Sequence, residues 1–397
     1  MEQVVASVET QVELPSPLDF SGPRRSGLPL QFYGPLQGYG SIASVAGEIA
    51  TQILKHVPGA GVWNYYGPPL FRGELEEELG LDANAPVGFF YGFPGYIPDF
   101  FDGHPVRIAA FVCESETIPA AWVERLQQVD LVIVPSEFCR RAFSDSGVTT
   151  PIMVVRHGLE PEFTPGEGSP VDGPFTFLNV FSSRLADRKS ANELIRCFRR
   201  ALGGMRDVRL QLRVDEPGIL PRLIREHDAE DLVHLDIPER RDVESLADCY
   251  RQAHCTVHPS KSEGFGLIPL QSIACATPVI APRHTALGEY LDDGNSMGLR
   301  MGRGDISLDS FGHPLDCGYR VDEPALEAAL HRMWSEWDRH KSLAATASPG
   351  IRGRFGWDAA LRNLMTLLRA LVDVEGGKER RDLIREAAAQ RPPTKAA

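Results

Sequence analysis

From about Leu28 onward, short apolar runs alternate with amphipathic segments, and no other feature constrains the fold of this chain as strongly. The alternation is typical of repeated strand–helix units around parallel sheets, and it does not fit an all-α or an all-β architecture. Each predicted strand is short and rich in Val, Ile, Leu or Phe. The predicted strands are 28–33, 107–112, 131–134, 152–155, 175–180, 208–214, 255–258 and 278–281.

The length of the chain, 397 residues, suits two such domains, because single cores stop growing at about 250 to 300 residues. Residues 158–174 interrupt the rhythm with proline clusters and acids, as an interdomain connection would. We therefore predict two Rossmann-like, doubly wound α/β domains facing a cleft where a ligand would bind. The predicted parts are a flexible N-terminal segment 1–23, an N-terminal domain 24–160, a linker 161–174, a C-terminal domain 175–348, a helix 349–373 that packs back toward the N-terminal domain, and a flexible charged tail 374–397.

Charge and cysteine usage exclude several classes of protein. The formal net charge of -13 argues against binding to a phosphate backbone, so nucleic acid is not an expected partner. The seven cysteines are scattered without a zinc-binding spacing, which predicts reduced and mostly buried thiols. Residues 1–20 do not resemble a signal peptide, and no later stretch approaches the roughly 18 apolar residues of a membrane span. We expect a cytoplasmic protein.

The first candidate motif is Gly38-Tyr39-Gly40-Ser41-Ile42-Ala43, which follows a predicted strand and opens a predicted helix. Glycines in this pattern let the backbone approach a phosphate or sugar closely, although a tight turn needed only for packing explains them as well. A dehydrogenase-type site would carry an acid about 20 residues further on to bind the ribose. Residues 58–64 offer none, which argues against a nicotinamide dinucleotide.

The second candidate is 181–190, which lies between a predicted strand and a helix predicted to begin near Ser190. It contains Arg184 and Lys189. Cations at the carboxyl end of a strand and beside a helix N-terminus would bind a diphosphate. Arg and Lys are also common in surface loops, so the segment alone leaves both interpretations open.

Residues 258–280 carry the most specific pattern, in which a strand, a glycine-rich turn, a helix and a second strand follow in close succession. The turn at 263–266 would present backbone N–H groups at a helix start to an anion, and Glu263 could accept hydrogen bonds from sugar hydroxyls. Gln271 lies eight residues after Glu263, on nearly the same side of the predicted helix.

This segment resembles the donor-binding signature of family 4 of the retaining glycosyltransferases, which adopt the two-domain GT-B fold. Arg184 and Lys189 resemble the diphosphate-binding pair of that family, and 130–138 with 157–165 resemble its strand and hinge entry. Residues 114–124 resemble an E-S-E-x-I-P-x-x-W-type segment found in a subset of these enzymes, and 355–357 stand in the place of an aromatic element before the terminal helix. The resemblance extends from about 38 to 368.

The resemblance implies specific roles. As catalytic residues, Arg184 and Lys189 would neutralise the donor's phosphates and the departing nucleoside diphosphate, and Glu263 would hold the sugar. The C-terminal domain would bind the nucleotide sugar and the N-terminal domain the acceptor. No cofactor besides the donor substrate and no metal are expected, because no Asp-x-Asp pair is placed to chelate a cation. The remaining donor-binding residues would be Gly38, Gly40, Gly264, Phe265, Gly266, Leu267 and Gln271.

Two departures from the family pattern matter. Gln271 replaces the usual second glutamate, which keeps a hydrogen-bond acceptor but loses the strength of a charged one. Many relatives also place a histidine near the acceptor, where this chain has Cys113 and Glu114. Glu114 is the predicted catalytic polar group there, and an acid that complements a helix start ahead of Pro119 is the alternative.

The leading hypothesis is a metal-independent hexosyltransferase that moves a sugar, with retention, from a nucleoside-diphosphate donor to a hydroxyl acceptor. The acceptor would be a glycan, a lipid-linked molecule or a small molecule, chosen by loops at 65–69 and 89–101. A lipid-linked acceptor would bring the protein to the inner face of a membrane. The alternatives are a catalytically weak nucleotide-sugar-binding partner subunit and a nucleotide-sugar epimerase of the same fold.

Overall fold

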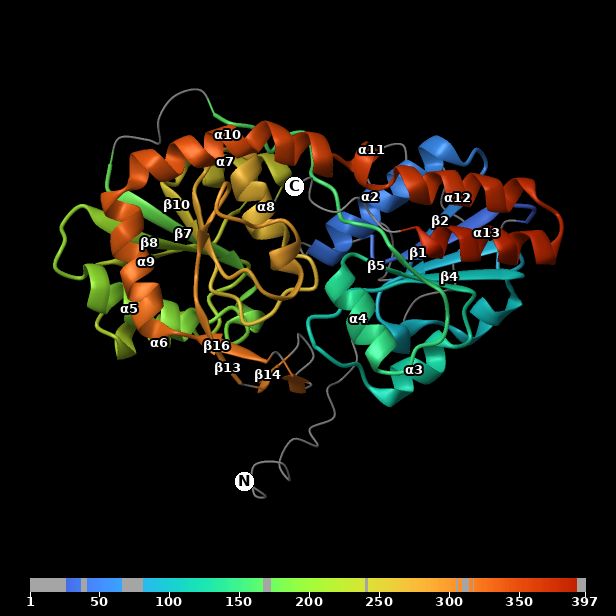
Figure 1. Ribbon diagram of the computed structural model, residues 1–397, viewed down its shortest axis with the longest axis horizontal. Helices are drawn as coiled ribbons and strands as arrows, with labels where there is room; N and C mark the ends of the chain where they lie inside the picture. The colour runs from blue at the N-terminus through green and yellow to red at the C-terminus, as the bar shows by residue number, and fades with distance from the viewer. Residues whose placement is uncertain are drawn as a thin grey trace, which may run out of the picture.

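The computed structural model describes residues 26–36, 41–65, 81–166, 173–239, 242–304, 306–308, 314–316 and 318–390. They form two α/β units that lie side by side (Figure 1). Each unit is built on a six-stranded sheet whose paired strands are parallel. The predicted fold class, two doubly wound Rossmann-like sheets, is confirmed.

The N-terminal unit has the strand order β2-β1-β3-β4-β5-β6. Its strands are buried almost throughout, which explains their continuous apolar character. The strands are β1 (Leu30–Gly34), β2 (Gly61–Asn64), β3 (Val87–Tyr91), β4 (Val106–Ala110), β5 (Leu131–Val134) and β6 (Ile152–Val154). The helices are α2 (Ser41–His56), α3 (Ala120–Leu126) and α4 (Glu137–Asp145), with 3-10 turns at Pro94–Tyr96 and Asp99–Gly103.

The C-terminal unit has the strand order β12-β11-β10-β7-β8-β9. Its strands are β7 (Phe175–Phe181), β8 (Val208–Val214), β9 (Val233–Asp236), β10 (Cys255–Val257), β11 (Val279–Ala281) and β12 (Met297–Gly298). Its helices are α5 (Ala191–Leu202), α6 (Leu220–Glu226), α7 (Val243–Gln252), α8 (Leu267–Ala274), α9 (Glu323–Ser335) and α10 (Trp337–Phe355), with 3-10 turns at Ser183–Leu185 and Thr285–Glu289.

Two small hairpins extend from the C-terminal unit after β12. The pairs are β13 (Met301–Arg303) with β16 (Tyr319–Val321) and β14 (Ile306–Leu308) with β15 (Pro314–Asp316). In Figure 1 they lie on the side of this unit that faces the N-terminal one. The first pair places Arg303 at the junction of the two units, 3.8 Å from Glu116.

The chain returns to the N-terminal unit at its end. Helix α10 packs on α8 of the C-terminal unit, and the chain then crosses to α11 (Trp357–Ala360), α12 (Arg362–Asp373) and α13 (Gly377–Ala389) (Figure 1). Apolar residues of these helices join the core of the N-terminal sheet; they include Trp357, Leu364, Leu368, Leu371 and Ile384.

The tail prediction for 374–397 is wrong over Gly377–Ala389, which form helix α13. Ile384 and Ala387, three residues apart and thus on one helical face, are buried in the N-terminal core. The charged residues that suggested a mobile tail occupy mainly the outer face of this helix.

Two further expectations change at the level of single elements. Phe89–Tyr91 belong to the buried strand β3, so the predicted acceptor loop at 89–101 begins after Tyr91. Residues 66–69 of the other predicted loop lie outside the described residues. None of the helices in the described part of the chain is both long and apolar enough to cross a bilayer.

Candidate active site

The sheet order of the C-terminal unit brings the two predicted donor segments together. Strand β10 pairs directly with β7, and the chain reverses its order of strand addition between them. The segment after β7 contains Lys189, and the segment after β10 contains Glu263. Ligands of open α/β sheets bind at this kind of switch point, beyond the carboxyl ends of the strands.

Lys189 and Glu263 form a buried ion pair at this point. The Lys189 ammonium contacts Oε1 of Glu263, and both side chains are less than a tenth exposed. His258, at the end of β10, shares a hydrogen bond of 2.8 Å between its Nε2 and the same carboxylate oxygen. The structure therefore brings together two of the predicted catalytic residues and a histidine from the adjacent strand.

The charge states of this cluster follow from its burial. Burial alone would raise the pKa of Glu263, but the charges of Lys189 and Arg188 and the hydrogen bond from His258 hold it well below its usual range. Burial and the charge of Arg188 lower the pKa of Lys189, against the attraction of Glu263. Burial also lowers the pKa of His258. Glu263 is thus a carboxylate that can only accept hydrogen bonds.

Arg188 is the second cation of the cluster; it lies in the predicted segment 181–190 but was not singled out as a donor-binding residue. Its side chain is 4% exposed, and its guanidinium lies 3.5 Å from Glu263 Oε2 and 3.3 Å from Glu114 Oε1. It also donates a hydrogen bond of 2.6 Å to the Ser262 carbonyl oxygen. Only its position next to Lys189 could have indicated it, since its partners are remote in sequence.

Glu114, the predicted acceptor-side catalytic residue, contacts Arg188 across the junction of the two units. It follows β4 of the N-terminal unit and is about one quarter exposed. The alternative, an acid at the first turn of a helix, does not fit, because α3 begins only at Ala120.

Arg184 is not brought into the cluster. It lies in the 3-10 turn Ser183–Leu185, its side chain is 72% exposed, and its Nε is 3.4 Å from Glu216 Oε1. A pair this exposed is weak, so the guanidinium is free to turn toward a ligand. Its role in phosphate binding stays a prediction.

The predicted glycine-rich turn leads into helix α8 as expected. Gly266 caps the helix with a φ of 89°, a backbone conformation that favours glycine. A Cβ atom there would also clash with Leu287, and the Tyr290 hydroxyl donates to the Gly266 carbonyl oxygen. This rigid turn aims the first backbone N–H groups of α8 away from the helix, as an anion site requires.

The side chains of this turn have structural roles of their own. Phe265 is buried and makes ring contacts with His157, Tyr290 and Phe355. Leu267 is half-buried and packs against the cores of both units. Their contribution to donor binding would therefore come from backbone N–H groups, as the resemblance implied.

Gln271 lies one turn into α8 and is buried. Its Oε1 accepts a hydrogen bond of 3.0 Å from the hydroxyl of Tyr250, which comes from α7. In the family, the glutamate that Gln271 replaces is thought to hold the ribose hydroxyls. One acceptor site of the Gln271 amide oxygen is thus engaged by Tyr250. Gly38 and Gly40, the other predicted donor-binding glycines, lie outside the described residues.

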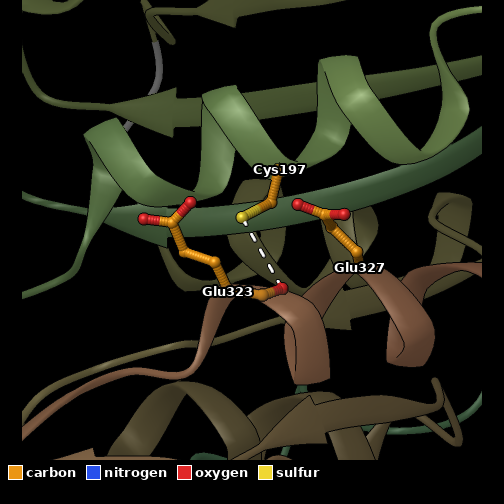
Figure 2. A group of neighbouring side chains, drawn as sticks. All are labelled: Cys197, Glu323 and Glu327. Atoms are coloured by element: carbon orange, nitrogen blue, oxygen red, sulfur yellow. Dashed lines mark hydrogen bonds between the residues drawn. The ribbon is translucent and has the colours of Figure 1, made fainter.

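One group of potential metal ligands is present among the described residues, and it contains none of the predicted site residues. Figure 2 shows Cys197 on α5 beside Glu323 and Glu327 on α9. Arg196 and Arg200 neutralise these carboxylates, with contacts of 2.5 Å from Arg196 to Glu323 and 2.6 Å from Arg200 to Glu327. Burial, then the charge of Glu323, raises the pKa of Cys197 to about 12, so its thiol stays protonated. The group is an ion-pair network that joins two helices.

A cavity of about 440 Å³ lies over β8 and β9 but contains none of the predicted site residues. Its walls are mostly polar, and several of the side chains that line it pair with one another. Arg213 contacts Asp236 at 2.9 Å and Ser245 at 2.6 Å. The cluster around Glu263 therefore remains the candidate active site.

A family model described as a family 4 glycosyltransferase in conflict systems matches residues 136–364, more than half of the chain. The chain belongs to the family 4 glycosyltransferases. The match begins after residues 114–124, so the assignment of this glycosyltransferase to the subset with that segment stays a prediction.

The curated relatives of this family 4 chain include two proteins that are named D-inositol 3-phosphate glycosyltransferase. The protein from Nocardiopsis dassonvillei is 36% identical over 170 residues, which cover 42% of this chain and 32% of the relative. The protein from Acidothermus cellulolyticus is 34% identical over 245 residues, which cover 57% of this chain and 52% of the relative. The chain thus matches between about a third and a half of the length of these relatives.

Solved structures share the fold of this family 4 chain over most of its length. HepE from Anabaena, solved with UDP-glucose, is 14% identical with a TM-score of 0.65, covering 86% of this chain and 99% of the other. Sucrose-phosphate synthase from Thermosynechococcus elongatus is 15% identical with a TM-score of 0.61, and the match covers 87% of this chain and 100% of the other. At these identities the likeness shows the GT-B fold alone.

Proposed function

We propose that this protein transfers a hexosyl group from a nucleoside-diphosphate sugar to a hydroxyl acceptor, with retention of anomeric configuration and without a metal ion. The observation that carries the proposal is the buried cluster of Lys189, Arg188 and Glu263 at the switch point of the C-terminal sheet, ahead of helix α8, in a family 4 chain. Fixed cations and helix N–H groups in one place suit a diphosphate, and an adjacent carboxylate suits sugar hydroxyls.

The proposed reaction needs no nucleophile from the protein. The bond between the anomeric carbon and the phosphate oxygen breaks, and its electron pair goes to the departing nucleoside diphosphate. Lys189 and Arg184 would stabilise the charge that develops there. The acceptor oxygen bonds to the anomeric carbon on the same face, and its proton passes to the departing phosphate oxygen.

Uridine-diphosphate sugars are the first donors to test, because structural neighbours were solved with UDP and UDP-glucose. An acceptor panel would include inositol phosphates, because curated relatives are named for D-inositol 3-phosphate. Thermal shift with a panel of nucleotide sugars would rank donors, since a ligand that binds only the folded state raises its melting temperature.

A second candidate is a nucleotide-sugar-binding partner subunit with little catalytic activity. The hydrogen bond between Gln271 and Tyr250 favours it, because it engages the amide that replaces the family's second glutamate. This protein would bind UDP-glucose without hydrolysing or transferring it. A transferase, in contrast, is expected to release some sugar to water slowly when no acceptor is present.

The cation role is tested with Arg184→Ala. We expect kcat/KM for the donor to fall about 10- to 100-fold, in line with the loss of one charge-assisted contact to a developing charge. The melting temperature should stay unchanged, because Arg184 is exposed. Arg222→Ala is the matched control, since Arg222 is equally exposed and also pairs with a glutamate.

Lys189→Met tests the buried cation in the same assay. We expect a loss of at least 100-fold in kcat/KM, together with some loss of stability, because Glu263 keeps only Arg188 and His258 as partners. Wild-type turnover in both the Lys189 and the Arg184 variant would rule out the proposed phosphate site.

A further inference from the structure

The segment Glu114-Ser115-Glu116 of the N-terminal unit contacts the C-terminal unit through both of its acids. Glu114 lies 3.3 Å from Arg188, and Glu116 lies 3.8 Å from Arg303 of β13. Ser115 between them is buried, and its backbone N–H donates to Cys113 Sγ, which fixes the turn. Two acids separated by a single residue thus reach two arginines that are far apart in sequence.

The first contact leads directly to the candidate active site. Arg188 is buried, and it bridges Glu114 on one side and Glu263 on the other. Its hydrogen bond to the Ser262 carbonyl holds the loop that carries Glu263. The position of Glu263 therefore depends on an arginine whose second carboxylate partner belongs to the other unit.

The second contact leads to the same loop through a series of side-chain contacts. The Arg303 guanidinium lies 5.0 Å from the ring centroid of Tyr319, which stacks on His284 at 3.8 Å with nearly parallel rings. The next residue, Thr285, accepts a hydrogen bond of 3.2 Å from the backbone N–H of Glu263. Glu114 is thus connected to the Glu263 side chain through Arg188, and Glu116 is connected to the Glu263 backbone through the contacts that begin at Arg303.

We infer that Glu114 and Glu116 are positioning residues that set Glu263, and with it Lys189, when the two units close on each other. The inference has a mechanical part, that the two acids hold the two units together, and a catalytic part, that this contact positions Glu263 for turnover. Only the catalytic part rests on the proposed function. Glu114 contributes most, because its partner Arg188 is buried, while the pair of Glu116 and Arg303 is exposed and weak by itself. Interfaces between domains of one chain are commonly this polar and open readily.

The mechanical part is tested by small-angle X-ray scattering on the full chain without nucleotide. Glu114→Gln combined with Glu116→Gln should increase the radius of gyration, because both ion pairs across the junction are lost. Glu124→Gln is the control, since Glu124 follows in the same segment and is exposed. The wild-type scattering curve should move in the same direction in 0.5 M NaCl, where exposed charges are screened.

A charge exchange separates positioning from simple loss of folding. Glu116→Arg should open the protein further, and adding Arg303→Glu should return the scattering curve to that of the wild type. Both side chains are more than 40% exposed, so neither change disturbs a core. An unchanged curve for the double glutamine variant, or no recovery in the charge exchange, would overturn the inference.

The catalytic part is read from turnover and binding in parallel. In the Glu114→Gln variant we expect kcat with UDP-glucose to fall about tenfold while the Kd for UDP changes less than about threefold, because the nucleotide binds mainly to the C-terminal unit. Equal kcat in this variant and in Glu124→Gln would contradict the positioning role. If the wild type turns over no donor, the proposed function fails, and the scattering experiment still decides the mechanical part.

Discussion

At the residue scale, Glu160 is a carboxyl buried where the chain leaves the N-terminal unit. Its side chain is 9% exposed, and its Oε2 has no hydrogen-bond partner. Burial, reinforced by the charges of Glu48 and Glu162, raises the pKa of Glu160 to about 7. Below that pH the folded protein holds this group as a neutral acid.

This raised pKa predicts a pH dependence of stability. In the unfolded chain Glu160 titrates near its ordinary value of 4.5, so unfolding releases a proton between that pH and about 7. The stability contributed by the neutral acid is complete below about 4.5 and is lost as the pH rises through about 7. Glu160→Gln should therefore match the wild type near pH 4.5 and exceed it at pH 8 by on the order of 3 kcal/mol.

Denaturant unfolding at several pH values measures this difference. Glu162→Gln is the matched comparison, because Glu162 is a neighbouring exposed acid. Its charge is one of the smaller causes of the raised pKa of Glu160, so this variant should show only a small part of the gain. A gain that stays constant from pH 4.5 to 8 for Glu160→Gln would show that the buried carboxyl is not neutral in the folded state.

Single residues of the site were predictable only in part. Lys189 and Glu263 lie in recognisable segments, and the switch point that unites them follows from the strand order. Arg188 gave no signal of its own, because its role is set by Glu114, 74 residues away and in the other unit. The engagement of Gln271 was equally hidden, since Tyr250 reaches it only through the packing of α7 on α8. Such contacts depend on tertiary structure, which local patterns do not encode.

At the element scale, the loop between β10 and α8 is also a contact surface for the N-terminal unit. The Ser136 hydroxyl, at the N-cap of α4, donates a hydrogen bond of 2.7 Å to the Gly264 carbonyl oxygen. A Cβ atom on Gly264 would lie 2.5 Å from Val112 Cγ1 and 2.6 Å from the Cys113 carbonyl oxygen. The two units are therefore in van der Waals contact at this glycine.

Gly264→Ala should separate the units at this contact. The added methyl group meets backbone that cannot simply rotate away, so we expect a larger radius of gyration and at least a tenfold lower kcat with UDP-glucose. Gly47→Ala is the matched control, because a Cβ there meets no atom within 4 Å, and in the interior of α2 it should stabilise by about 0.5–1 kcal/mol. Full activity of the Gly264 variant would show that this contact is dispensable.

Elements differed in how well local pattern predicted them. Helix α2 was predictable from the spacing of Val45, Ala46 and Ile49, which are buried as expected. Strands β2 and β3 were missed, because glycines and aromatic residues beside prolines suggested loops. Residues 375–397 read as a charged, helix-like run, and their charge suggested a flexible tail; the packing of α13 was missed, although Ile384 anchors this helix in the core.

At the scale of the whole molecule, the chain crosses between the units twice. The first crossing follows β6, and the second follows α10, so the N-terminal sheet is covered by helices from both ends of the sequence (Figure 1). The two sheets nevertheless keep separate buried clusters on their helix-covered faces. Leu368 of α12 belongs to the N-terminal cluster, and Leu330 of α9 belongs to the C-terminal one.

This arrangement predicts that each unit unfolds locally without the other. Leu368→Ala and Leu330→Ala remove the same group from fully buried helix positions, so each should cost about 2–5 kcal/mol in its own unit. Hydrogen exchange should then accelerate in β4 but not in β8 for Leu368→Ala, and in β8 but not in β4 for Leu330→Ala. Each variant is the control for the other. Equal acceleration in both sheets would mean that the two units unfold as one cooperative body, held together by the two crossings and by the contacts at Gly264 and Arg188. In that case Leu368 of α12 would stabilise the C-terminal sheet as much as the N-terminal one.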